Sequence, residues 1–343
     1  MDVVWNVDNP FRDITGLPRR TNTLVAEHGL YTVGGNTGTV TRLDPDSGTR
    51  EWVRELGDHI DRPETVQVMP DRSFLTAATD DETLHALDVS TGETRWTQSL
   101  DSTVEAVSLT DDSVVVAWSG ESSDDASGVG CLAGEDGTWR WDQSKAALRE
   151  ATGYDPILPR TLSEPFDETV YVGTPNIGFR VRTTEGSVVG EAPSGTHRPL
   201  LGDDSIYIPG LDWVDAVTLS SFSHLWTAEP SESLSTGIAL TDSGVYFGAR
   251  DHGLYGIARE TGDRLWRYEM ESEVETTPAI AAGLVWTSER ETDDRLVAVD
   301  AETGRPVGQF LVGGEVQAVT GSDDALYVFT SEQTYRLNPS SIE

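Results

Sequence analysis

A ten-residue phrase recurs along the chain and constrains the fold more than any other feature. It reads LDPDSGTREW at 43–52, LDVSTGETRW at 87–96 and IARETGDRLW at 257–266, with a degenerate copy, VDAETGRPVG, at 299–308. A polar residue that caps its own turn, followed by a glycine free to adopt positive φ, predicts a tight hairpin. The glycines of the four copies are Gly48, Gly92, Gly262 and Gly304. The even offset from glycine to tryptophan predicts that both lie on the same face of the strand.

The spacing of the tryptophans predicts the size of the repeating unit. Trp52 and Trp96 are 44 positions apart, and Trp226 and Trp266 are 40 apart. A period of about 40–50 residues is typical of propeller blades and of some helical repeats. Helical repeats need apolar residues at a spacing of about 3.6, whereas the apolar runs here are short and β-branched or aromatic, such as SVVVAW at 113–118. The sequence therefore predicts an all-β fold, a β-propeller.

Seven complete units can be placed on the chain, each a set of short β runs followed by the turn. They span 30–56, 74–100, 113–143, 169–192, 205–229, 244–270 and 283–312. An eighth unit begins at Ala325 and stops at LNPSSIE, where its fourth strand should start. The segment DVVWNV at 2–7 carries Trp5 where the other units keep their tryptophan, so we expect it to complete the last blade and close the ring. The prediction is eight four-stranded blades in one domain spanning 1–343, with seven blades as the fallback.

The pattern Y-x-G…L-x-A-L-D-x-x-T-G-x-x-x-W is similar to the repeat of the PQQ-like propellers. That family includes quinoprotein alcohol dehydrogenases and a propeller lipoprotein of the bacterial outer-membrane assembly machinery. The resemblance covers essentially the whole chain, and it implies that the repeat tryptophans pack between neighbouring blades: Trp5, Trp52, Trp96, Trp141, Trp226 and Trp266. Gly190 and Gly308 stand where tryptophan is expected, so we expect those two junctions to be looser or filled by other residues.

The charge composition is extreme. There are 59 acidic residues against 24 basic ones, giving a formal net charge of −35, and Lys145 is the sole lysine. The acids are dispersed along the chain, which suits a protein in concentrated salt, where the Debye length is about 3 Å at 1 M. The composition resembles that of haloarchaeal proteins. Nucleic-acid binding needs basic patches, which the sequence lacks, so we expect no nucleic-acid partner.

Location and redox state are constrained by what the sequence lacks. There is no run of 18 apolar residues, so we expect no membrane span. The segment MDVVWNVDNPF has neither a basic nor a long apolar region, which predicts a cytoplasmic protein, or a cell-surface one if an upstream signal has been removed. The single cysteine, Cys131, excludes an internal disulfide and any cysteine-cluster metal site.

The residues that carry chemistry in related enzymes are missing. In quinoprotein dehydrogenases of this family, the quinone lies near a disulfide between adjacent cysteines and a calcium ion, and one cysteine cannot form that disulfide. The six histidines have no metal-ligand spacing. Asp44 and Glu55 match the first and twelfth positions of a calcium loop, but the repeat already assigns this segment to a turn and a strand. We therefore expect no catalytic activity, no cofactor and no metal site.

The candidate binding residues lie in loops that join one blade's outer strand to the next blade's inner strand. The longest loop, 142–165, contains the helix-forming segment SKAALREATGY with Lys145 and Arg149, and long insertions of this kind are often functional. Arg20, Arg62 and Arg198 each stand just before an inner strand, which predicts an arginine-lined mouth that could bind an anion or a carboxylate. The alternative is that these arginines pair with neighbouring acids.

Trp118 and Trp213 fall outside the repeat position. Trp213, in PGLDWVDAV, is predicted at a hairpin, either exposed as a contact residue or packed against its own blade. Together these features predict a monomeric, non-catalytic binding or scaffold propeller whose partner is another protein. The competing interpretations are a quinone-dependent dehydrogenase and a small-anion sensor that uses the arginine-lined mouth.

Overall fold

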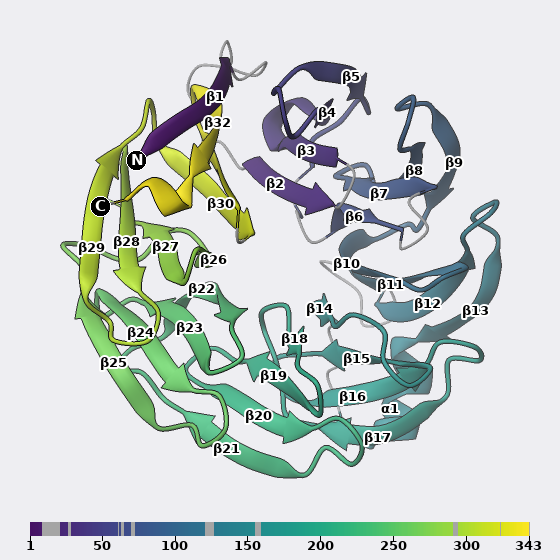
Figure 1. Cartoon of the computed structure of the whole chain (residues 1–343). Coiled ribbons are helices and arrows are strands. Elements are labelled where there is room, and N and C mark those ends of the chain that lie inside the picture. Colours follow the sequence, from purple (N-terminus) through teal and green to yellow (C-terminus); the bar gives the residue numbers. More distant parts are fainter. Residues whose placement is uncertain are drawn as a thin grey trace.

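The computed structural model describes residues 1–8, 21–26, 29–60, 62, 65–69, 73–120, 127–154, 159–290, 294–322 and 324–342. Eight four-stranded antiparallel sheets stand around a central axis, with their first strands innermost (Figure 1). The prediction of an eight-bladed β-propeller is therefore confirmed. In seven blades the strands follow chain order from the axis outward, as expected for repeated meanders.

Blades 1 to 4 occupy the first half of the chain. Blade 1 contains β2 (Thr21–Ala26), β3 (Gly29–Gly34), β4 (Thr39–Leu43) and β5 (Arg50–Glu55). Blade 2 contains β6 (Gln67–Val68), β7 (Phe74–Thr79), β8 (Thr83–Asp88) and β9 (Thr94–Ser99). Blade 3 contains β10 (Thr103–Leu109), β11 (Ser113–Ser119), β12 (Gly128–Ala133) and β13 (Trp139–Ser144). Blade 4 contains β14 (Thr161–Leu162), β15 (Thr169–Gly173), β16 (Gly178–Arg182) and β17 (Val188–Ala192).

Blades 5 to 8 complete the ring. Blade 5 contains β18 (Leu200–Leu201), β19 (Ser205–Pro209), β20 (Val214–Thr218) and β21 (His224–Ala228). Blade 6 contains β22 (Leu234–Leu240), β23 (Gly244–Ala249), β24 (Gly253–Ala258) and β25 (Arg264–Glu269). Blade 7 contains β26 (Ala279–Ala281), β27 (Leu284–Ser288), β28 (Arg295–Asp300) and β29 (Pro306–Leu311). Blade 8 contains β30 (Val316–Ser322), β31 (Ala325–Thr330), β32 (Gln333–Asn338) and β1 (Asp2–Asp8).

The two ends of the chain share the last blade. β1 pairs antiparallel with β32, from Asp2 opposite Asn338 to Asp8 opposite Gln333, and Figure 1 shows the purple strand beside the yellow one. This confirms the predicted closure of the ring by the N-terminal strand. The helices of the described chain are α1 (Lys145–Thr152) and two short 3₁₀ turns, and none of them is long and apolar enough to cross a membrane.

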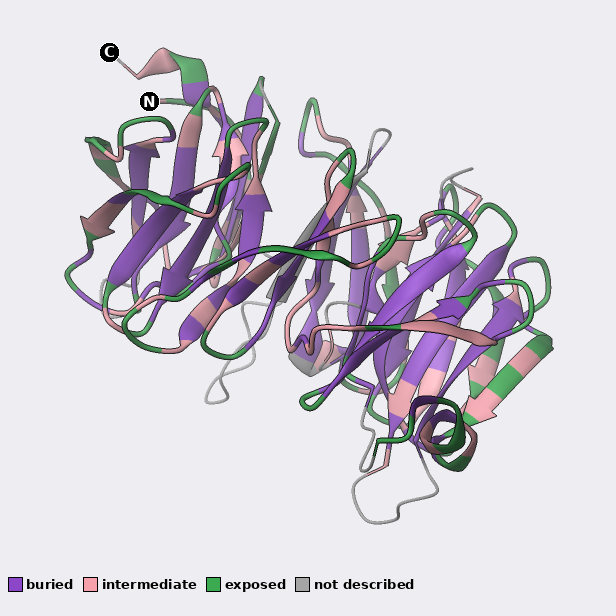
Figure 2. Ribbon diagram, turned by 90° about the horizontal axis from the view of Figure 1, so that it is seen from below, coloured by how far each residue is buried: buried purple, intermediate pink, exposed green. Residues whose placement is uncertain are grey.

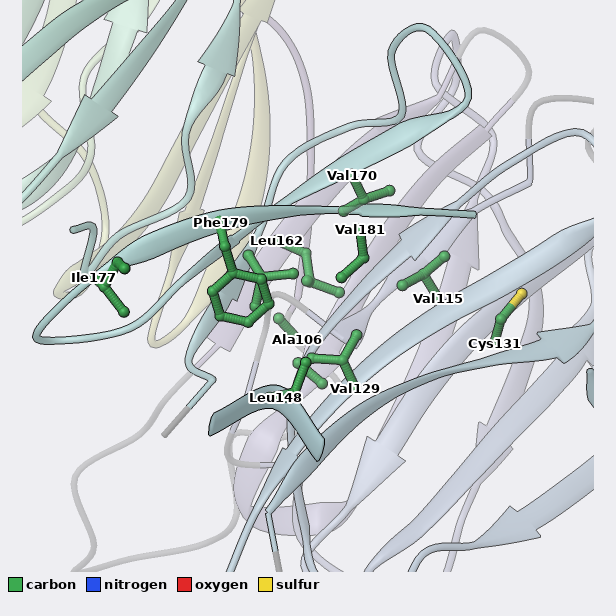
Figure 3. Packing of buried hydrophobic residues seen from close by; sticks show 12 residues of the cluster. Ala106, Val115, Val129, Cys131, Leu148, Leu162, Val170, Ile177, Phe179 and Val181 are labelled. Atoms are coloured by element: carbon green, nitrogen blue, oxygen red, sulfur yellow. The ribbon is translucent and has the colours of Figure 1, made fainter. Parts of the chain in front are cut away.

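The buried residues lie mainly between neighbouring blades. Figure 2 shows buried segments along the middle of most strands and exposed residues at the turns. Figure 3 shows one such cluster, in which Val115 and Val129 of blade 3 pack with Val170 and Phe179 of blade 4. Leu148 of α1 packs against the same cluster. Each blade is therefore stabilised by apolar contacts with the next, because a single four-stranded sheet cannot bury its own faces.

At most junctions a tryptophan of one blade packs on a glycine of the next. The Trp52 indole nitrogen donates to the carbonyl of Val89 at 2.8 Å, and the ring lies so close to Gly92 that an added Cβ would stand 2.7 Å from it. Gly92 has a φ of 71°, which favours glycine for a second reason. Six pairs share this contact: Trp5–Gly48, Trp52–Gly92, Trp96–Gly137, Trp141–Gly186, Trp226–Gly262 and Trp266–Gly304.

The path from the turn to the tryptophan differs from the sequence prediction. Arg42 pairs with Trp52 and Leu43 pairs with Arg50, so Glu51 is the extra residue of a β-bulge. The strand is thus not unbroken between glycine and tryptophan, and the even-offset argument was wrong. A bulge occupies the same place in all eight outer strands, at Val4, Glu51, Arg95, Arg140, Val189, Leu225, Leu265 and Val307.

The two junctions without a tryptophan are filled by other residues. Between blades 4 and 5, Arg180 pairs with Gly190, and its guanidinium group lies 4.7 Å from the centre of the Phe222 ring. Phe222 takes the turn position that glycine holds elsewhere, with a φ of 53°. Between blades 7 and 8, Phe310 packs against the core beside Gly308, 5.7 Å from the Trp286 ring.

Candidate functional site

The loops that enter each blade share one side of the ring with the hairpins between second and third strands. The Asp80 N–H of a blade 2 hairpin donates to the carbonyl of His59, in the loop entering that blade, at 2.9 Å. The Leu234 N–H, at the start of blade 6, donates to the carbonyl of Leu211, in the blade 5 hairpin, at 2.8 Å. We call this side the connection face. It holds most of the predicted binding residues.

Arg62 links two blades close to the axis. Its Nε lies 3.0 Å from a carboxylate oxygen of Glu105, on the innermost strand of blade 3. Glu105 is buried, and its other oxygen accepts the hydroxyl of Ser119. A buried carboxylate needs such donors, because an unpaired charge away from water is costly. Arg62 therefore balances an internal acid.

Arg198 also links two blades, but it contacts the blade that precedes its own in the chain. Its Nη2 lies 3.5 Å from a carboxylate oxygen of Glu164, so the start of blade 5 contacts blade 4. Arg20 lies outside the described residues. For Arg62 and Arg198 the structure thus shows pairing with neighbouring acids, which was the alternative weighed from the sequence. A shared anion site built from all three arginines stays a prediction.

The helix predicted within 142–165 is present as α1. The Ser144 hydroxyl accepts the Ala147 N–H at 3.4 Å at its start, and Gly153 ends it with a φ of 75°. Lys145 is buried, so its ammonium group faces the protein and is not on the surface. Arg149 is half-buried in the last turn, where a cation interacts favourably with the helix dipole. A role for Lys145 or Arg149 in binding stays a prediction.

Trp213 lies on the blade 5 hairpin and folds back over it. The side chain is half-buried, and a Cβ added to Gly210 would stand 2.3 Å from its ring. The Trp213 ring therefore packs against its own blade, as the second of the two sequence interpretations predicted. Two positions earlier, Leu211 is 52% exposed. Leu211 was not predicted as a contact residue, although its place between a Pro-Gly pair and an aspartate in a hairpin is visible in the sequence.

An ion-pair network on blades 6 and 7 was also missed. Glu273 lies 2.7 Å from Arg290 and 3.6 Å from Arg250, and Arg290 also lies 3.3 Å from Glu275. Buried Glu289 accepts the Ser272 N–H at 2.9 Å and so holds the loop that enters blade 7. Dispersed acids in the sequence gave no sign of which ones would be structural, because their partners lie on other loops, 15 to 23 positions away along the chain.

Burial lowers the pKa of two histidines near this face, His85 and His197. The His85 ring lies 3.1 Å from the Thr79 hydroxyl. Within the described residues, no group of three or more His, Cys, Asp or Glu side chains is arranged to hold a metal ion.

The fold and its repeat can now be compared with known proteins. A family described as "Outer membrane protein assembly factor BamB" matches residues 36–200 and 212–340. The chain belongs to this family. No curated protein sequence matches it. The resemblance to PQQ-like propellers is therefore confirmed.

Solved structures similar to this member of the BamB family share its fold at low identity. BamB from Moraxella catarrhalis superposes with a TM-score of 0.76 at 16% identity, covering 98% of this chain and 99% of that one. Quinohemoprotein alcohol dehydrogenase from Comamonas testosteroni gives a TM-score of 0.75 at 13% identity, covering 98% of this chain and 76% of that one. A computationally designed protein, Ika8, gives 0.72 at 14% identity, covering 95% and 98%.

Proposed function

We propose that this chain is a non-catalytic, monomeric binding propeller that holds another protein against its connection face. Exposed apolar side chains at that face carry the proposal. Leu211 is 52% exposed and Tyr154 is 45% exposed, in a chain whose net charge is −35. Exposed apolar side chains in loops of one face are candidate contact residues for a partner protein.

The family supports the same class of function. Its name is that of an assembly factor, a role that depends on contacts between proteins. The inter-blade pairs of Arg62 and Arg198 hold the loops beneath the face in place, and a preformed surface loses less conformational entropy on binding. We propose one domain over 1–343 and no cofactor, and the cytoplasmic location stays a prediction.

The test is affinity capture from cells that make the protein, in molar KCl. The variant Leu211→Asp combined with Trp213→Ala should reduce the recovered partner at least tenfold, because it removes the apolar contact. Leu225→Asp changes an equally exposed leucine on the outer wall of blade 5 and is the matched control. Equal recovery with both variants would contradict the proposed contact face.

A second candidate is a quinone-dependent dehydrogenase. The superposition with a quinohemoprotein alcohol dehydrogenase over 98% of this chain favours it. The only cysteine, Cys131, is buried on β12, so the disulfide between adjacent cysteines that the resemblance implies cannot form. Adding pyrroloquinoline quinone with calcium and recording the absorbance of the dialysed protein separates the two: a bound chromophore would support the enzyme.

A further inference from the structure

One outer strand carries neither a charged residue nor a histidine. It is β29, PVGQFL. Six of the other seven outer strands carry at least one charged residue, as in REWVRE of β5, WRWDQS of β13 and RLWRYE of β25, and β21, HLWTA, carries only His224. In a chain with 83 charged residues, from 59 acids and 24 bases, a neutral outer strand is unexpected.

Outer strands are edges that need protection. Each presents unpaired N–H and C=O groups, and natural proteins discourage pairing with other chains by placing charges or bulges there. The bulge of β29 lies near its start, at Val307, so the register from Gly308 to Leu311 is regular. The later half of β29 therefore has neither form of protection.

The backbone of this half directs free groups outward. The Val312 N–H donates to the carbonyl of Asp294 at 2.8 Å, which marks these two residues as a hydrogen-bonded pair. In an antiparallel ladder such pairs alternate, so Leu311 and Gln309 direct their N–H and C=O groups away from β28. Leu311 is also 77% exposed, the largest value among the exposed large apolar side chains of the described residues.

We propose that the Gly308–Leu311 edge of β29 binds an extended strand of a partner protein by strand addition. The proposal rests on the proposed function and adds a second surface to it. Leu311 is followed directly by the loop that enters blade 8 on the connection face, so a partner on that face can continue along β29. Main-chain hydrogen bonds would supply affinity, and Leu311 an apolar contact.

Charge favours a neutral or basic partner over a second copy of this chain. Pairing two β29 edges would bring together two bodies that each carry a formal charge of −35. A strand from a neutral or basic protein avoids that repulsion. The partner segment is therefore an uncharged, β-forming stretch with basic flanks.

The probe is a fluorescein-labelled peptide of ten alternating valines and threonines with two lysines at each end. Its binding is followed by fluorescence anisotropy in 1 M KCl, and amide exchange is measured at residues 309 and 311. We expect saturable binding, slower exchange at both amides, and at least tenfold weaker binding for Leu311→Lys. Leu265→Lys, which adds the same charge to the neighbouring outer strand at a 48% exposed leucine, should bind as the natural chain does.

Three results would overturn the inference: no saturable binding, equal loss in both lysine variants, or equal binding of a peptide N-methylated on alternate residues. A dimer in sedimentation that Leu311→Lys dissociates would assign the edge to a second copy instead. The proposed function is tested separately. If Leu311→Lys captures the same partner in undiminished yield while the Leu211 and Trp213 variant does not, the strand-addition inference falls and the contact face stands.

Discussion

Arg180 takes, at one junction, the place that tryptophan holds at six others. Its Nη1 donates to the carbonyl of Leu219 at 3.5 Å, as the Trp52 indole donates to Val89, and its plane covers Phe222. Arg42 and Arg336 stand at the equivalent position beside Trp52 and Trp5 and also reach into the next blade. An arginine at this site is therefore a second way to join blades. In blade 4 it acts without the tryptophan.

Replacing Arg180 with alanine should lower the free energy of unfolding by about 2–4 kcal/mol, since a charged hydrogen bond and a cation–π contact are lost together. Denaturant unfolding measures the change. Arg264→Ala, at an exposed position on β25, is the control and should have almost no effect. Equal unfolding curves for the two variants would show that Phe222 and Gly190 hold the junction without the arginine.

The contact between Trp52 and Gly92 should behave as a coupled pair. Gly92→Ala places a methyl group 2.7 Å from the indole and also strains a residue at positive φ, so we expect a large loss of stability. With Trp52→Ala already present, the same change should cost only the strain, about 1 kcal/mol. A double-mutant cycle in denaturant measures the coupling. Additive effects would mean that residues 52 and 92 are not energetically coupled.

At the scale of elements, the turns are determined by local hydrogen bonds and the outer strands by pairing with a neighbouring strand. The turn aspartate of the phrase accepts hydrogen bonds from its own turn, as Asp88 does from the Ser90 N–H at 2.9 Å and the Ser90 hydroxyl at 2.6 Å. This is local chemistry that the sequence states directly. The bulge before each tryptophan is not visible in the sequence, because it depends on how the outer strand pairs with the third strand.

The turn aspartates predict a loss of stability in acid. Hydrogen bonds from serine or threonine lower the pKa of Asp44, Asp88 and Asp300 below the ordinary aspartate value of 3.8. Their contribution is complete above the unfolded pKa and is lost as pH falls through the lower folded pKa. The melting temperature should therefore decrease below about pH 4. Asp88→Asn should weaken this dependence, and an unchanged slope would contradict the assignment.

Closure by β1 predicts that its removal affects the whole ring. Deleting residues 2–7 removes the outer strand of blade 8 and the Trp5 contact with Gly48. Trp5 is half-buried, so its loss alone should cost less than the about 3–5 kcal/mol that is typical of a fully buried tryptophan. The deletion should lower the melting temperature more than Trp5→Ala does, as measured by circular dichroism. A melting temperature equal to that of the full chain would contradict the closing role of β1.

For the whole molecule, charge is the dominant property. The formal net charge of −35 already counts every arginine and lysine, so internal ion pairs do not reduce it, and the molecule repels itself unless salt screens the charge. The melting temperature should fall as KCl drops below about 0.5 M and rise towards several molar. Equal stability in dilute buffer and in molar KCl would show that the acidic composition is not an adaptation to salt.

The candidate site was less predictable than the fold. The sequence placed Trp213 on a hairpin and a helix in the long insertion, because both depend on nearby residues. It could not show that Lys145 is buried or that Arg62 reaches Glu105, since position 105 belongs to another blade. Leu211 and the residues of the neutral strand β29 can be read from the sequence. Their exposure to solvent could not be predicted from it.

The sequence by itself determined the repeat, the number of blades and the closing strand. Turn chemistry and alternating apolar runs act over a few residues, so the phrase ending at Trp52 specifies its own hairpin wherever it occurs. Only the tertiary structure decided that Trp52 meets Gly92, that Arg180 replaces a tryptophan, and which acids neutralise which arginines. These contacts join residues about 40 positions apart, and they exist only once eight blades stand side by side in a ring.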